Sequence, residues 1–209
     1  MPPNKSVPHD WYPGNLPDNV ILGEGCSFET SYGLRRFFSR RKRGLVLGAH
    51  SACYANTQFA TGRDACITVG EYTMLNGVYL HCQERIDIGS HVLVSWDVLI
   101  TDSDAVPYCA AERAACLRAC ARDRYGRLPP ASSSPVCIED DVWIGFSCIV
   151  LPGVRIGAGS VIGARSVVDQ DIPSGVIACG NPARIVRKMQ RDAGGRNEKN
   201  IVKDDEPPI

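Results

Sequence analysis

The feature that most constrains this chain is a six-residue repeat in its C-terminal half. Aliphatic side chains recur at every sixth position there: Ile138, Ile144, Val150, Ile156, Ile162 and Val168. A small or branched residue follows each of the first five by four positions, as Cys148 follows Ile144. This period fits neither an α-helix nor a simple alternating strand. It predicts a triangular coil in which each hexad gives one short strand and one turn, so that about 18 residues close one coil.

The same frame extends toward the N-terminus. Ile88 begins an earlier coil and is predicted to stack under Ile138, whereas Val69 begins another coil that reaches Ile88 after a slip of one residue. Weaker traces of the repeat occur at Leu22-Gly23 and Leu47-Gly48. The sequence therefore predicts an all-β fold, a parallel β-helix with the shape of a triangular prism.

The repeat also sets the expected boundaries. Residues 1–45 form an irregular N-terminal segment and first coil, which includes a basic run at 35–43, and residues 46–181 form the β-helix. The repeat stops at about 102–135, an excursion in which Ala110 to Arg124 favours a short helix. Pro182 is suited to begin a C-terminal helix over 182–191. The charged stretch 192–209 is predicted to be a disordered tail.

Composition excludes few functions, but it indicates which partners and which cellular compartment to expect. Lys plus Arg and Asp plus Glu both number 23, so net charge indicates neither nucleic acid nor a membrane as a partner. There is no apolar signal segment and no stretch long enough to insert into a bilayer, so we expect a cytoplasmic protein. Ten cysteines without a CxxC pair are interpreted as reduced and structural, with no metal site. Those at core-like positions are Cys53, Cys66, Cys82, Cys137 and Cys148.

Five motifs carry a family resemblance. They are Val142–Gly145, Leu151–Val154, Ile162–Val168, Asp171–Pro173 and Gly180–Ala183. From about Val69 to Lys188 the chain resembles the hexapeptide-repeat acetyltransferases, and within them the sugar O-acetyltransferases of the galactoside, maltose, nodulation-factor and colanic-acid type. The resemblance implies a left-handed β-helix, acetyl-CoA as acyl donor, and a homotrimer with active sites between adjacent prisms.

The resemblance also implies where acetyl-CoA lies. The matching positions are Phe146, Ala164, Asp169, Gln170, Arg184 and Arg187. The two arginines suit the phosphates of the cofactor. Phe146 is a departure, because the family commonly has a small residue at that position.

The family's catalytic histidine is missing from its usual place. Related chains read Asp-Ser-Asp-x-His-Pro after the corresponding coil, whereas this chain has Val106 at the histidine position, which follows Asp102 and Asp104. Histidine is suited to deprotonate an acceptor hydroxyl because its pKa lies near neutral pH. His81 is the candidate substitute base, and it faces outward if Cys82 faces inward beneath Ile100.

Other residues have supporting roles. Asp102 and Asp104 are weak bases unless perturbed, and are expected to shape the turn or orient the acceptor. Asn76 matches a family position near the acceptor, and the excursion is expected to overhang that site.

Three readings of Val106 stay open. Another group serves as the base, or the chain is a degenerate relative that binds CoA or sugar without turnover, or Val106 is a substitution. Metal catalysis of the γ-class carbonic anhydrase kind needs three converging histidines, for which the four in this chain offer no pattern. The function predicted is acetyl transfer from acetyl-CoA to a hydroxyl of a saccharide or saccharide-like acceptor.

Overall fold

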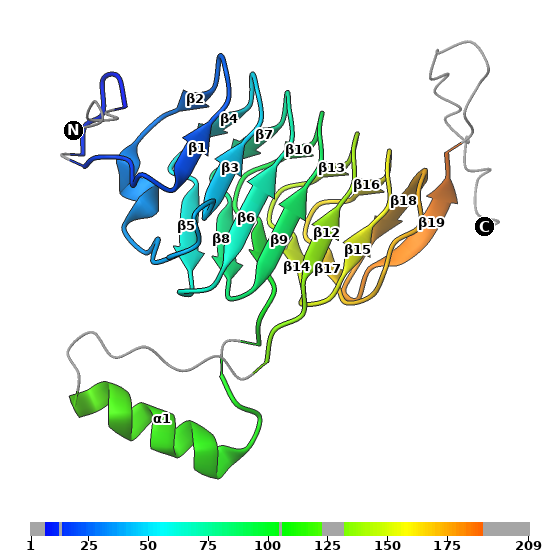
Figure 1. Ribbon diagram of the computed structural model, residues 1–209. Coiled ribbons are helices and arrows are strands. Elements are labelled where there is room, and N and C mark those ends of the chain that lie inside the picture. The colour runs from blue at the N-terminus through cyan, green and yellow to red at the C-terminus, as the bar shows by residue number, and fades with distance from the viewer. Residues whose placement is uncertain (1–6, 13, 105, 123–131, 190–209) are drawn as a thin grey trace.

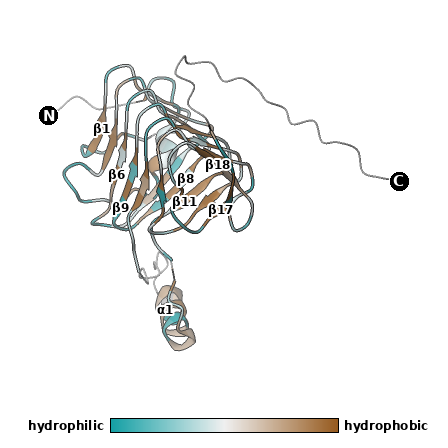
Figure 2. Cartoon of the chain, turned by 90° about the vertical axis from the view of Figure 1, so that its right-hand side faces the viewer, coloured by the Kyte–Doolittle hydropathy of each residue, from teal (hydrophilic) through white to brown (hydrophobic). Residues whose placement is uncertain are grey.

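Three parallel sheets form the sides of a triangular prism (Figure 1, Figure 2). The computed structural model describes residues 7–12, 14–104, 106–122 and 132–189 of the chain. Sheet A contains β1 (Val20–Leu22), β3 (Leu45–Leu47), β6 (Cys66–Val69), β9 (Arg85–Ile88), β12 (Val136–Ile138) and β15 (Arg155–Ile156). Sheet B contains β2 (Ser27–Phe28), β4 (Ala52–Tyr54), β7 (Met74–Asn76), β10 (Leu93–Val94), β13 (Trp143–Ile144), β16 (Val161–Ile162), β18 (Val176–Cys179) and β19 (Arg184–Lys188). Sheet C contains β5 (Gln58–Thr61), β8 (Tyr79–Cys82), β11 (Leu99–Thr101), β14 (Ile149–Val150) and β17 (Val167–Val168). The predicted left-handed parallel β-helix is confirmed.

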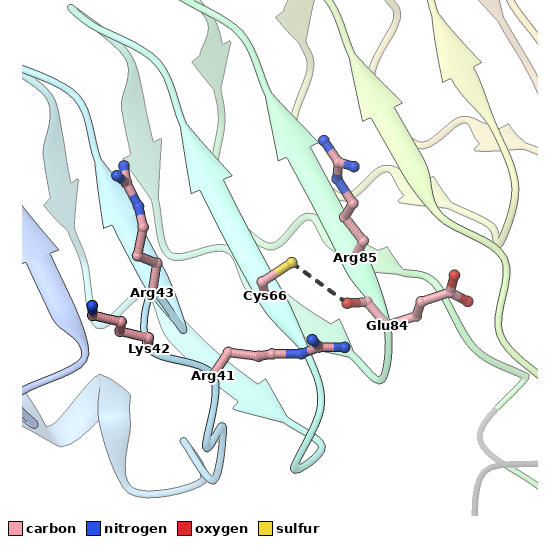
Figure 3. A pocket seen from close by; sticks show the side chains of 6 residues that line it. All are labelled: Arg41, Lys42, Arg43, Cys66, Glu84 and Arg85. Carbon is pink, nitrogen blue, oxygen red and sulfur yellow. Dashed lines mark hydrogen bonds between the residues drawn. The ribbon is translucent and has the colours of Figure 1, made fainter.

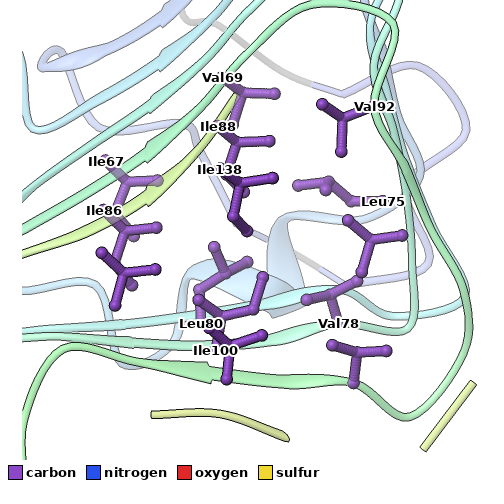
Figure 4. Close-up of a cluster of buried hydrophobic side chains, with 14 of the residues drawn as sticks. Ile67, Val69, Leu75, Val78, Leu80, Ile86, Ile88, Val92, Ile100 and Ile138 are labelled. Atoms are coloured by element: carbon purple, nitrogen blue, oxygen red, sulfur yellow. The ribbon is translucent and has the colours of Figure 1, made fainter. Parts of the chain in front are cut away.

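The core of the prism consists of columns of aliphatic side chains. Val69, Ile88 and Ile138 lie above one another in sheet A, as Figure 4 shows. Leu75 and Leu80 provide inward side chains from sheets B and C, and both are fully buried. Each coil therefore covers the apolar side of the coil before it, which is the burial that a single hexad cannot achieve alone.

The coils differ in length. Ile138 pairs with Ile156, eighteen positions on, but Val69 pairs with Ile88 after nineteen and Leu80 with Ile100 after twenty. Leu80, not Cys82, is therefore in register with Ile100, because this coil has two residues more than the repeat assumes. Cys82 also points inward, so His81 between them faces outward.

The N-terminal segment is an irregular start of the same prism. β1 already pairs in parallel with β3, but the 3-10 helix η1 (Ser31–Leu34) stands where a sheet C strand would complete the first coil. The Thr30 hydroxyl caps η1 by accepting a hydrogen bond from Tyr32 N.

The excursion leaves the prism between β11 and β12, at the corner that joins sheet C to sheet A. It contains the helix α1 (Ala110–Arg122), which Figure 1 shows standing away from the prism. No described helix is long and apolar enough to cross a membrane.

The predicted C-terminal helix is wrong. Residues 184–188 form β19, which runs antiparallel to β18 at the end of sheet B. The last parallel strand would otherwise leave its backbone N–H and C=O groups unpaired, and β19 satisfies them. Ile185 and Val186 are β-branched, which favours a strand over a helix. Residues 190 and 191 and the predicted tail 192–209 lie outside the described residues.

Candidate functional site

Several of the predicted site residues lie on the outward side of sheet C or at the corners that flank it. Tyr79, Leu99, Ile149 and Val167 form one half-buried row across four coils. His81 lies at one edge of this sheet, next to the excursion, and Phe146 lies at the opposite corner. The arrangement is an apolar strip with an imidazole at its edge.

His81 is held by two polar neighbours. Its Nδ1 lies 3.1 Å from Thr101 Oγ1, on the adjacent strand, and its Nε2 lies 3.1 Å from Gln83 Nε2. The Thr101 hydroxyl donates its one hydrogen to the carbonyl oxygen of Ser103, at 2.8 Å. Thr101 Oγ1 must therefore accept from His81, which assigns the proton to Nδ1 and leaves a lone pair on Nε2. Nε2 in turn accepts from the Gln83 amide.

The pKa of His81 agrees with this hydrogen-bond network. Burial lowers the pKa of His81 from its ordinary value of 6.5, while the negative charge of Asp102 opposes the shift. The neutral imidazole is therefore the predominant form near pH 7. A partly exposed, neutral imidazole with its lone pair on Nε2 has the properties of a general base.

Asp102 has a structural role. Its side chain is fully buried and accepts hydrogen bonds from the backbone N–H groups of Gln83, Glu84 and Arg85, at 2.7 to 2.8 Å. The Cys82 thiol also donates to this carboxylate, at 3.3 Å. Asp102 thus fixes the turn that follows β8 and places Gln83 beside His81, but a substrate cannot reach it directly.

Asp104 and Val106 lie where the excursion begins. Asp104 accepts hydrogen bonds from the Tyr108 hydroxyl at 3.0 Å and from Ser132 Oγ at 2.6 Å. Ser134 N donates to the carbonyl oxygen of Asp102 at 2.8 Å, so both strands of the excursion stem are joined at this corner. Val106 is half-buried, and its N–H donates to the carbonyl oxygen of Asp104.

Asn76, Phe146 and Ala164 lie at another corner, where sheet B turns into sheet C. Asn76 is buried and its amide donates to the carbonyl oxygen of Val94 at 3.3 Å. Phe146 is 52% exposed and lies one coil before Ala164, which is also exposed. This corner and the His81 corner flank the same sheet, so the structure separates Asn76 from His81 by the width of sheet C.

The remaining predicted cofactor residues lie at the C-terminal end of the prism. Asp169 and Gln170 are exposed and follow β17 directly. Arg184 Nη1 pairs with Asp169 Oδ1 at 3.1 Å, and the two side chains are 54% and 38% exposed. Arg187 is exposed on β19.

Two of the other histidines lie away from this surface. His50 and His91 occupy the corner between sheets A and B and stack on either side of Tyr72, with ring centroids 4.9 and 5.7 Å away. Within the described residues no group of three or more His, Cys, Asp or Glu side chains is placed to hold a metal. All ten cysteines are free thiols, and Cys66 and Cys137 face outward from sheet A rather than into the core.

Sequence reasoning missed Thr101, Gln83 and Trp96. Thr101 and Gln83 hold His81, and their roles depend on the twenty-residue coil that sets their register. Trp96 is 61% exposed at the same corner as Phe146, one coil earlier. A large aromatic residue at a turn position was the available signal for Trp96.

Comparisons with known proteins agree with the fold. The family profile described as bacterial transferase hexapeptide (six repeats) matches residues 138–170. A 2,3,4,5-tetrahydropyridine-2,6-dicarboxylate N-acetyltransferase of Clostridium perfringens is 45% identical over 73 residues, which are 35% of this chain and 31% of that relative. The chain therefore spans about a third of the length of this curated relative.

One solved structure supports the same architecture. AntD, an N-acyltransferase from Bacillus cereus solved with dTDP and 3-hydroxybutyryl-CoA, aligns with a TM-score of 0.58 at 16% identity, covering 82% of this chain and 84% of AntD. A maltose O-acetyltransferase from Clostridium difficile aligns with a TM-score of 0.46 at 24% identity, covering 82% of this chain and 67% of that one. The chain is similar to the hexapeptide-repeat acetyltransferases, as its motifs predicted.

Proposed function

We propose that this chain transfers an acetyl group from acetyl-CoA to a hydroxyl of a saccharide or saccharide-like acceptor, with His81 as the general base. The observation that carries the proposal is the hydrogen-bond network that leaves the Nε2 lone pair of a neutral imidazole on the outward side of sheet C. Acetyl and acyl transfer are also the reactions named for the relatives and structural neighbours.

The chemistry follows from the position of Nε2. The acceptor hydroxyl displaces the Gln83 amide and donates its hydrogen bond to Nε2. His81 takes the proton as the acceptor oxygen attacks the thioester carbonyl, and it then returns that proton to the departing thiolate of CoA. Thr101 stabilises the transient imidazolium because its oxygen continues to accept from Nδ1.

Acetyl-CoA is proposed to lie along sheet C toward the C-terminal coils. The row containing Leu99, Ile149 and Val167 offers an apolar strip for the pantetheine arm. Phe146 and Ala164 border this strip, as do Asp169 and Gln170 at its other side. Arg184 and Arg187 on β19 supply cations for the phosphates.

We also infer a homotrimer in the cytoplasm. Sheet B has exposed apolar side chains outward at Met74, Leu93 and Trp143, in register across three coils. Sheet C has its own apolar row, so two different faces of each prism are unsuited to water. Packing sheet B of one copy on sheet C of the next is a heterologous contact, which closes into a ring at a suitable rotation angle.

The test is an acyl-transfer assay on the purified chain, with CoA release followed by chromatography because the chain has ten thiols. Saccharide hydroxyls and matched amines are offered as separate acceptors, since the curated relatives are named as N-acetyltransferases. His81→Asn should lower the rate about 100- to 10,000-fold, the usual contribution of general base catalysis. His91→Asn is the matched control and should be unaffected.

The outcomes separate the possible functions. Transfer only to amines would replace the proposed acceptor class, and full activity of His81→Asn would remove the proposed base. Acetyl-CoA binding without transfer to any acceptor would favour the degenerate binder, in which the Gln83 amide keeps Nε2 occupied.

A further inference from the structure

A basic depression lies at the edge of sheet A, on the N-terminal coils and away from the proposed cofactor strip. It is lined by Arg41, Lys42, Arg43, Cys66, Glu84 and Arg85, and Figure 3 shows the cationic side chains around the Cys66 thiol. Four of the six lining residues are cations. Three of them belong to the basic run 35–43, for which the proposed function gives no role.

The backbone that presents these cations is fixed. Ser39 Oγ donates to the carbonyl oxygen of Ala65 at 2.6 Å, and Arg40 N donates to the carbonyl oxygen of Arg63 at 2.7 Å. The side-chain amide of Asn19 donates to the carbonyl oxygens of Ser39 and Arg41, at 2.9 and 3.0 Å. Anchoring to the neighbouring coil reduces the entropy lost when a ligand binds.

Ion pairs among the described residues neutralise little of the positive charge in the depression. Among the described residues, no carboxylate lies within ion-pair distance of Arg41, Lys42 or Arg43, while Arg85 pairs with Asp87 at 2.5 Å. Arg41 Nε donates to the carbonyl oxygen of Asp64, which orients its guanidinium.

Glu84 does not neutralise this group. Its Oε2 accepts from Ser133 Oγ in the excursion stem, at 2.8 Å, and Figure 3 shows its carboxylate pointing away from Lys42 and Arg43. Glu84 contributes its carbonyl oxygen to the depression, facing the Cys66 thiol. The positive charge is therefore concentrated around Arg41, Lys42 and Arg43, away from the Glu84 carboxylate.

We propose that this depression binds the phosphoryl or diphosphate group of a ligand. A group with two negative charges matches several adjacent cations better than one carboxylate does, and guanidinium groups bind phosphate oxygens in bidentate fashion. The open shape of the depression suits an anionic group at the end of a larger molecule.

The depression lies close to His81, which indicates that its ligand is the acyl acceptor. This assignment rests on the proposed function. Arg85 follows His81 by four residues, so their Cα atoms are at most about 14 Å apart. The turn held by Asp102 places Gln83 against His81 and Arg85 in the depression. A phosphorylated saccharide with its charge in the depression is long enough to bring a hydroxyl near His81.

The first experiment is a calorimetric titration with pyrophosphate at fixed ionic strength. We expect binding that is at least tenfold weaker in the double variant Arg41→Gln/Arg43→Gln. The matched control Arg118→Gln/Arg122→Gln on α1 changes net charge equally and should bind as the wild type does. Circular dichroism confirms that both double variants are folded.

Three results would overturn the site. They are no binding by the wild-type chain at millimolar pyrophosphate, equal weakening in both double variants, or binding of malonate as tight as that of pyrophosphate. Displacement of pyrophosphate by acetyl-CoA would assign the depression to the acyl donor instead of to a separate ligand.

A second readout does not depend on acyl transfer. Cys66 lines the depression and is partly exposed, so bound pyrophosphate should slow its alkylation by iodoacetamide at least severalfold, as measured by peptide mass spectrometry. Cys137, two coils on in sheet A and outside the depression, is the internal control. Protection of Cys66 without any acyl transfer would keep the site and reject only the proposed function; no protection would reject the site.

Discussion

Sheets A and C have similar inward sides but different outward sides. Inward, both consist of buried aliphatic residues in register from coil to coil. Outward, sheet A has Thr68 donating to Asp87 and an ion pair between Arg155 and Glu139, whereas sheet C has an apolar row with His81 at its edge. Figure 2 shows the brown colour of β11 and β17 on the sheet C side.

The inward side chains are required by the fold, whereas the outward side chains can differ from one sheet to another. The repeat requires only that one side chain in each hexad points inward, so the outward positions are free to vary. Sheet A uses several of them for polar contacts between neighbouring coils. Sheets B and C expose apolar surface at a cost in solubility, which is typical of surfaces that are covered in use.

The largest expected effect concerns the corner between the two sheets. Asp102→Ala removes the acceptor of three backbone N–H groups in a fully buried place, so the free energy of unfolding should fall by about 3 kcal/mol or more. Asp102→Asn retains one oxygen acceptor and should cost about half as much. Urea unfolding measures both; a loss below about 1 kcal/mol for the alanine variant would show that water replaces the carboxylate.

The second prediction tests whether the apolar outward sides are covered. Leu93→Asp places a charge on the exposed side of sheet B and should weaken self-association at least tenfold, because the carboxylate is desolvated in the contact. Val46→Asp makes the same chemical change on the outward side of sheet A and should leave association unchanged. Sedimentation velocity distinguishes the two. A wild-type chain that stays monomeric at working concentration contradicts the proposed assembly.

The third prediction uses the lowered pKa of His81. The base is active when neutral, so the rate should be constant above the pKa and fall tenfold per pH unit below it. Because burial lowers this pKa, the midpoint should lie below 6.5. Thr101→Val removes the partner of Nδ1 and should shift the imidazole toward the Nε2–H form, which nitrogen-15 NMR of His81 reports directly. An Nε2–H signal in the wild type would contradict the assigned tautomer.

The smallest effect is expected on sheet A. Arg155→Gln breaks an exposed ion pair with Glu139, whose other carboxylate oxygen still accepts from Ala158 N at 2.7 Å. Exposed pairs of this kind contribute less than about 1 kcal/mol to folding. Thermal unfolding should show a shift of a few degrees at most, and a larger loss would mean that the polar side of sheet A is more than a solvated surface.

The sequence suggested residues for the candidate site, but it did not predict the contacts among them. The motif around Asp102 marked the corner, and His81 followed because the family's histidine position holds Val106. The contacts of His81 with Thr101 and Gln83 could not be predicted, because a coil of twenty residues shifts the register by two positions relative to an eighteen-residue coil. The buried position of Asp102 depends on the same turn.

The sequence by itself determined the prism, because a strict six-residue apolar period has one efficient way to bury its side chains. It did not determine β19, because local preference for a helix after Pro182 competes with the unpaired edge of β18, and only the assembled sheet presents that edge. The outward network of His81 and the basic depression were likewise decided by the tertiary structure. Both join residues about a coil apart, and coil length alone sets which of them meet.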